Sequence, residues 1–92
     1  MNKYVIERLI PKVGTLEGQQ LQAAAAQSCK ALVAIGHKIQ CLESYVAADQ
    51  TYCVYLAQDE EIIRRHAELS GFPANRITQI GKMIDPTTAS AK

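Results

Sequence analysis

The chain lacks tryptophan, has a single phenylalanine, and contains no long stretch of uncharged apolar residues in its 92 positions. Its longest such run, residues 31–36, is far shorter than the roughly 20 apolar residues that a membrane-spanning helix needs. Lys3, Glu7 and Arg8 also interrupt the apolar stretch that a secretory signal peptide would require. We therefore expect no membrane segment, and a cytoplasmic location.

The chain also lacks an excess of charge of either sign. Ten Lys and Arg residues balance nine Asp and Glu residues, which leaves a formal net charge of +1. A nucleic-acid-binding domain normally gathers a basic surplus on one face, because phosphate contacts supply much of its affinity. Nucleic acid is therefore not an expected partner.

Cysteines are few, odd in number and widely spaced. Cys29, Cys41 and Cys53 form no Cys-x-x-Cys pair, which argues against a zinc knuckle, and an odd count in a reducing compartment argues against a disulfide framework. No glycine-rich phosphate loop is present, and no serine stands at a telling spacing from a histidine. The sequence indicates no organic cofactor and favours a non-enzymatic role without deciding the question.

The residue pattern that is present predicts six elements in the order strand–helix–strand–strand–helix–strand. β-Branched and aromatic residues favour strands, whereas apolar residues repeating every three or four positions favour helices. Thr15 is the expected N-cap of the first helix, and Gly36 its expected end. The expected strands cover residues 4–10, 38–46, 51–57 and 76–84. The expected helices cover residues 16–35 and 60–70, and the second is capped by Asp59 and ended by Gly71.

This order predicts an α+β ferredoxin-like sandwich, with a four-stranded antiparallel sheet and two helices on one face. Residues 1–86 would form the single domain, and residues 87–92 a frayed C-terminal tail. No helix remains to cover the other sheet face. Because tyrosines and aliphatic residues supply apolar side chains to both faces, we expect a homodimer through the open face.

An RNA-recognition motif, a common occupant of this fold, is not expected. Such a motif stacks bases on aromatic residues that share one face of the third strand. Tyr52 and Tyr55 are three residues apart, so they point to opposite faces.

Four metal-capable side chains stand out along these elements. His66 follows Ile62 on the inward face of the second helix, and an inward histidine needs a hydrogen-bond partner or a metal. Glu7 of the first strand is a candidate partner for it. Cys53 lies in mid-strand, and Glu43 is an acid in an otherwise apolar strand.

Whether Glu43 and Cys53 share a face depends on the hairpin between their strands. A loop of two or four residues places them on opposite faces, whereas a loop of three or five places them on the same face. The sequence leaves both alternatives open.

Several longer segments of the chain are distinctive. The most specific is the hairpin segment Ser-Tyr-Val, residues 44–46, followed by Cys-Val-Tyr, residues 53–55. Further segments are Tyr-Val-Ile-Glu-Arg at residues 4–8, Asp-Glu-Glu at 59–61, Gly-Phe-Pro-Ala at 71–74 and Ile-Asp-Pro-Thr-Thr at 84–88. Together they resemble a family of small bacterial proteins of unassigned function, some of which are described as nickel-binding with a dimeric ferredoxin-like fold.

The resemblance implies that Glu43, Cys53 and His66, together with Glu7, are the candidate metal ligands. It also shows two departures from many relatives: Cys41 stands where tryptophan is common, and Glu43 where some members have histidine. Mixed N, O and S ligands suit nickel, cobalt or zinc.

We therefore expect a dimeric protein that binds nickel or another divalent transition ion at the sheet face. Two alternatives stay open. One is an enzyme of the dimeric α/β-barrel type, acting on a small organic molecule with His66 or Glu7 as the acid–base group. The other is a purely structural interaction domain.

Overall fold

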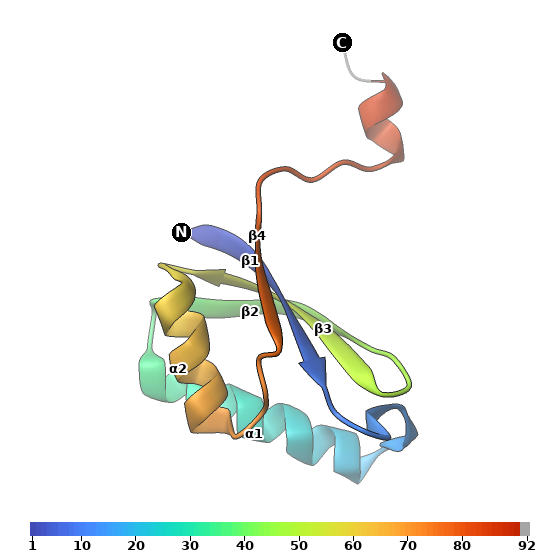
Figure 1. Cartoon of the computed structure of the whole chain (residues 1–92), viewed down its shortest axis with the longest axis vertical. Coiled ribbons are helices and arrows are strands. Elements are labelled where there is room, and N and C mark those ends of the chain that lie inside the picture. The colour runs from blue at the N-terminus through green and yellow to red at the C-terminus, as the bar shows by residue number, and fades with distance from the viewer. Residues whose placement is uncertain (91–92) are drawn as a thin grey trace.

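The computed structural model describes residues 1–90 and contains six regular elements and two short 3₁₀ turns (Figure 1). In chain order these are β1 (Asn2–Leu9), η1 (Val13–Thr15), α1 (Gln19–Ile35), β2 (Ile39–Val46), β3 (Gln50–Ala57), α2 (Glu60–Ser70), β4 (Arg76–Ile80) and η2 (Pro86–Ser90).

The four strands form one antiparallel sheet in the order β2-β3-β1-β4. β1 lies in the interior of the sheet, where Ile6 stands opposite Cys53 of β3 and Ile77 of β4. β1 and β2 follow one another in the chain but are separated by β3 in the sheet, and β3 and β4 are separated by β1. Each of these connections therefore crosses over one strand, the first through α1 and the second through α2. The predicted ferredoxin-like α+β fold is confirmed.

Both helices cover the same face of the sheet. Tyr55 of β3 shows this directly, because its hydroxyl lies 3.3 Å from Ser28 Oγ of α1 and its ring lies 5.2 Å from the His66 ring of α2. The core therefore forms between this face and the helices. Its buried members are Tyr4, Ile6, Ile39, Cys53, Tyr55, Ala57 and Ile63.

α2 begins and ends as its sequence predicts. The Asp59 carboxylate accepts a hydrogen bond from the Ile62 backbone N–H at 3.0 Å, and Gly71 ends the helix at a φ of 79°, a conformation that favours glycine. Glu60 pairs with Arg64 across one turn, at 3.0 Å. The inward side of α2 carries Ile63, His66 and Ser70, as expected from the periodicity.

α1 begins later than predicted. Its N-cap is Gly18 rather than Thr15, which lies in η1. The Thr15 hydroxyl donates to the Lys12 carbonyl at 2.7 Å, so it stabilises the 3₁₀ turn instead of a helix start. Gly36 follows the last helical residue, as predicted.

The β2–β3 hairpin settles the register that the sequence leaves open. Val46 stands opposite Thr51, so four residues connect the paired positions, and Ser44 faces Cys53 while Glu43 faces Val54. A β-bulge between Cys41 and Glu43 changes the alternation along β2. Cys41 consequently stands opposite Tyr55, on the helix-covered side.

The C-terminal segment leaves the domain after β4, which is shorter than the predicted strand 76–84. Residues 81–90 are all exposed, and Figure 1 shows this segment running away from the sheet to end in η2. Its hydrogen bonds join Asp85 to Thr87 and Thr88 within the segment. The predicted frayed tail thus includes one 3₁₀ turn, and residues 91 and 92 lie outside the described residues.

Candidate functional site

The structure distributes the four predicted ligands over both sides of the sheet. Glu7 of β1 and Glu43 of β2 stand opposite Tyr52 and Val54, on the face without helices, whereas Cys53 and His66 lie on the covered side. Among residues 1–90, no three His, Cys, Asp or Glu side chains come together closely enough to hold a metal ion. A single copy of the described chain therefore lacks a complete metal site.

The open-face acid Glu7 is held in place by two neighbours. Gln50 donates to its Oε1 at 3.1 Å, and Arg76 Nε lies 3.8 Å from its Oε2. It does not partner His66, because the sheet separates them. Glu43 stands on the same open face and is exposed.

His66 is wholly buried, and its partner is α1 rather than a carboxylate. Its Nε2 lies 3.2 Å from both the hydroxyl and the backbone carbonyl oxygen of Ser28. Because a carbonyl oxygen can only accept, Nε2 carries the proton when it bonds to that oxygen. Nδ1 then carries no proton and can only accept a hydrogen bond, and it has no hydrogen-bond partner within residues 1–90.

Arg8 is not one of the site residues predicted from the sequence, yet its side chain is buried on the covered side, with 2% of its surface exposed. Its Nη1 donates to the Pro73 carbonyl oxygen at 2.8 Å, and its guanidinium carbon lies 5.9 Å from the centre of the Tyr55 ring. Its Nη2 has no partner in the described chain. The signal was available, because Arg8 shares its phase of the strand alternation with the core residues Tyr4 and Ile6.

Arg8, Tyr55, His66 and Ser28 thus form a buried polar cluster between the sheet and the helices. Burial lowers the pKa of His66, and the nearby Arg8 charge lowers it further, whereas the bond to the Ser28 carbonyl opposes both effects. Burial also raises the pKa of the Tyr55 hydroxyl, partly offset by Ser28 and Arg8. At neutral pH the cluster holds a neutral imidazole, a neutral phenol and one fixed positive charge.

The lowered His66 pKa predicts a specific pH dependence of stability. As the pH falls, the unfolded chain takes up the histidine proton near pH 6.5, and the folded chain takes it up only at a lower pH. The imidazole in the folded chain is surrounded by Arg8, Tyr55 and Ser28, none of which supplies a carboxylate that would favour its charged form. Full stability is thus present above about pH 6.5 and is lost as the pH falls towards the folded pKa, by at most about 1.4 kcal/mol per unit. Urea unfolding between about pH 7.5 and 5.5 measures this slope.

The exposed His37 provides the matched control for this prediction. Replacing His66 with Gln is expected to flatten the slope in that pH window, whereas replacing His37 with Gln leaves it as in the natural chain. Equal slopes for the natural chain and the His66 variant would show that this histidine does not control acid sensitivity.

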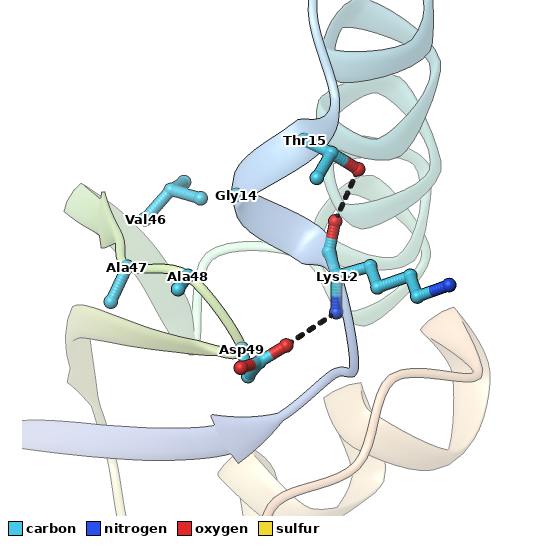
Figure 2. A pocket seen from close by; sticks show the side chains of 7 residues that line it. All are labelled: Lys12, Gly14, Thr15, Val46, Ala47, Ala48 and Asp49. Carbon is cyan, nitrogen blue, oxygen red and sulfur yellow. Dashed lines mark hydrogen bonds between the residues drawn. The ribbon is translucent and has the colours of Figure 1, made fainter.

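A separate hollow of about 450 Å³ lies where η1 meets the hairpin loop (Figure 2). The Asp49 carboxylate accepts from the Lys12 backbone N–H at 2.8 Å, and the Gly14 N–H donates to the Ala48 carbonyl at 2.9 Å. A side chain at Gly14 would meet the Ala47 carbonyl oxygen at 2.7 Å. Figure 2 shows the Lys12 side chain pointing away from the loop, so this hollow is a structural junction without a cluster of reactive groups.

The comparison with known proteins agrees with this fold. Residues 4–80 match the family described as nickel responsive protein SCO4226-like. The chain belongs to this family. The resemblance drawn from the sequence is thereby confirmed, and with it the association of the family with nickel in its description.

A solved structure has the same fold. The crystal structure of SCO4226 from Streptomyces coelicolor A3(2) superposes with a TM-score of 0.72 over 89% of this chain and 99% of the other, at 15% sequence identity. At that identity the likeness establishes the fold alone. No curated protein matches the chain, and no helix among its described residues is long and apolar enough to cross a membrane.

Proposed function

We propose that the protein is a homodimeric, metal-responsive binding protein in which the uncovered sheet faces of two copies meet and complete a site for a divalent transition ion. The observation that carries this proposal is the separation of the ligands. Each copy presents Glu7 and Glu43 on a face that has no helix to cover it. The family's description as nickel responsive supports nickel as the ion.

The open face suits a second copy of itself. Its centre is apolar, with Val5 and Val54 side by side across β1 and β3, and both are only partly exposed. Around this centre stand basic side chains and the two acids, so opposite charges can meet across a two-fold axis. The open-face set is Lys3, Val5, Glu7, Gln40, Glu43, Tyr45, Tyr52, Val54, Leu56, Arg76, Thr78 and Ile80.

The projecting C-terminal segment also supports a second copy. Met83 and Ile84 are 69% and 78% exposed on a segment that extends beyond the domain in Figure 1. Four strands of five to eight residues, about 4.8 Å apart, give a face on the order of 450 Å². A stable interface uses about 800 Å² from each partner. The two apolar side chains of this segment would add to the area of the sheet face by packing on the neighbouring copy.

Two copies also supply the number of ligands that one copy lacks. In one chain β3 lies between the strand that carries Glu7 and the strand that carries Glu43, so these two strands are roughly 10 Å apart across the sheet. A two-fold arrangement brings four carboxylates to the interface, and carboxylate oxygens coordinate divalent ions, manganese among the transition metals. Cys53 and His66 lie on the covered side of the sheet, so they are not part of this proposed site.

Calorimetric titration of the metal-free protein with Ni²⁺ tests this proposal. We expect a dissociation constant tighter than about 100 μM, which corresponds to roughly −5.5 kcal/mol, the level that adventitious sites reach. Glu7→Gln and Glu43→Gln should each weaken binding by at least about tenfold, because each removes charged ligands from both copies. The exposed acid Glu17 lies elsewhere, and Glu17→Gln should bind as the natural chain does.

Two results would contradict the proposal. One is the absence of binding tighter than that limit. The other is binding that survives both open-face variants but is lost in Cys53→Ala or His66→Gln, which would locate the ion on the covered side.

A further inference from the structure

The buried cluster on the covered side contains a positive charge without a counter-ion. A guanidinium has five N–H donors and stays charged when buried. Arg8 makes one recorded hydrogen bond, to Pro73, and no carboxylate of residues 1–90 forms an ion pair with it. A buried, unpaired charge is strongly unfavourable, so this arrangement points to a negatively charged partner that the chain itself does not supply.

A second unpartnered atom borders the same aromatic ring. His66 Nδ1 is buried and accepts no hydrogen bond, while Arg8 Nη2 is buried and donates none. The centre of the His66 ring lies 5.2 Å from the centre of the Tyr55 ring, and the guanidinium carbon of Arg8 lies 5.9 Å from it. A partner that satisfies both atoms needs an acceptor oxygen for the guanidinium and an O–H donor for the imidazole.

The structure also offers a route to this cluster. Residues 71–75 have no regular secondary structure, and the Pro73 carbonyl in this segment is what Arg8 binds. Directly outside Pro73 lies an open hollow of about 310 Å³. It is lined by Arg64, Ala67, Glu68, Phe72, Pro73 and Ala74. Arg8 is not among the lining residues, so a ligand that enters from this hollow must displace the segment 71–75 to reach the guanidinium.

We propose that Arg8, Tyr55 and His66 form a binding site for a small hydroxyl-bearing oxyanion, entered past the segment 71–75. Arg8 Nη2 donates to an anionic oxygen of the ligand, and the ligand hydroxyl donates to His66 Nδ1. Small 2-hydroxy acids and hydrogen phosphate both have this chemistry. The site lies on the opposite side of the sheet from the proposed metal site and is independent of it.

Titration of the full chain at about pH 7.5 with glycolate, acetate, hydrogen phosphate and sulfate, at ionic strength fixed with chloride, tests the site. Glycolate and hydrogen phosphate should each raise the melting temperature in a saturable way, because they bind the folded state. Tighter binding of glycolate would identify the ligand as an organic hydroxy acid, whereas tighter binding of hydrogen phosphate would identify it as inorganic phosphate. Acetate and sulfate lack the hydroxyl, and they should bind at least about tenfold more weakly.

Arg8→Met should weaken binding by at least about thirtyfold, since it removes the charged donor while keeping an apolar stem. Arg65→Met removes an arginine that is exposed on α2 and should leave binding unchanged. Equal stabilisation by all four anions, or equal binding by natural chain and Arg8→Met, would overturn the proposal.

A measurement on the natural chain remains decisive if Arg8→Met does not fold. Glycolate or hydrogen phosphate should shift the NMR signals of the His66 ring and leave those of the exposed His37 ring in place. Unchanged His66 signals at saturating anion would equally overturn the site.

Discussion

Replacing Tyr55 with Ala is expected to destabilise the protein by about 3–5 kcal/mol, as other buried aromatic truncations do. Tyr55 is 2% exposed on the interior strand β3, and its ring contacts both the His66 ring and the Arg8 guanidinium. Truncation leaves a cavity, and it also removes the aromatic surface beside a buried charge. The total stability of a domain of this size is of the same order, so much of the variant should be unfolded at 37 °C.

Tyr55→Phe provides the matched comparison. It keeps the ring and removes only the hydroxyl, whose partner Ser28 Oγ lies at 3.3 Å. We expect a loss below about 1.5 kcal/mol, the usual range for one neutral hydrogen bond. Urea unfolding at fixed protein concentration measures both losses, because a dimer's apparent stability depends on concentration. Similar losses for the two variants would show that the ring itself contributes little.

Replacing Val54 with Glu is expected to convert the proposed dimer to a monomer. Val54 lies at the centre of the open face, between Val5 of β1 and Glu43 of β2. The substitution buries a carboxylate beside an existing one, and two-fold symmetry places two such carboxylates in each interface. A buried, unpaired charge costs several kcal/mol, so association should weaken by at least about a thousandfold.

Val33 allows the same substitution outside the interface. It lies on α1 and is 81% exposed, so Val33→Glu adds the same charge to the chain without touching the sheet. Sedimentation equilibrium at micromolar concentration should find twice the chain mass for the natural protein and for Val33→Glu, and the single chain mass for Val54→Glu. A natural chain that sediments as a monomer would refute the dimer outright.

The strand alternation shows how far the sequence predicts the site. In β1, Tyr4, Ile6 and Arg8 share one phase, and all three are buried, while Glu7 takes the other phase and points to the open face. The period-two pattern contains this information. What it does not contain is that the segment carrying Pro73 would cover Arg8, because arginine at a strand end is ordinarily solvated.

The β2–β3 hairpin marks a different limit. The bulge at Leu42 lets Ile39 and Cys41 face the helices while Glu43 and Tyr45 face away, although all four positions are odd-numbered. Strict alternation would place them together. A bulge changes the phase of a strand through its pairing with the neighbouring strand, and local residue preferences specify it weakly.

The sequence by itself determined the order and kind of the six elements, the cap and end of α2, and the opposite faces of Tyr52 and Tyr55. These follow from interactions between residues a few positions apart, which the local pattern records. Only the tertiary structure decided that Glu7 and Glu43 are separated from Cys53 and His66 by the sheet, and that Ser28, rather than Glu7, partners His66. Those arrangements involve residues from different elements, and their positions depend on how the helices cross the sheet, which no local pattern encodes.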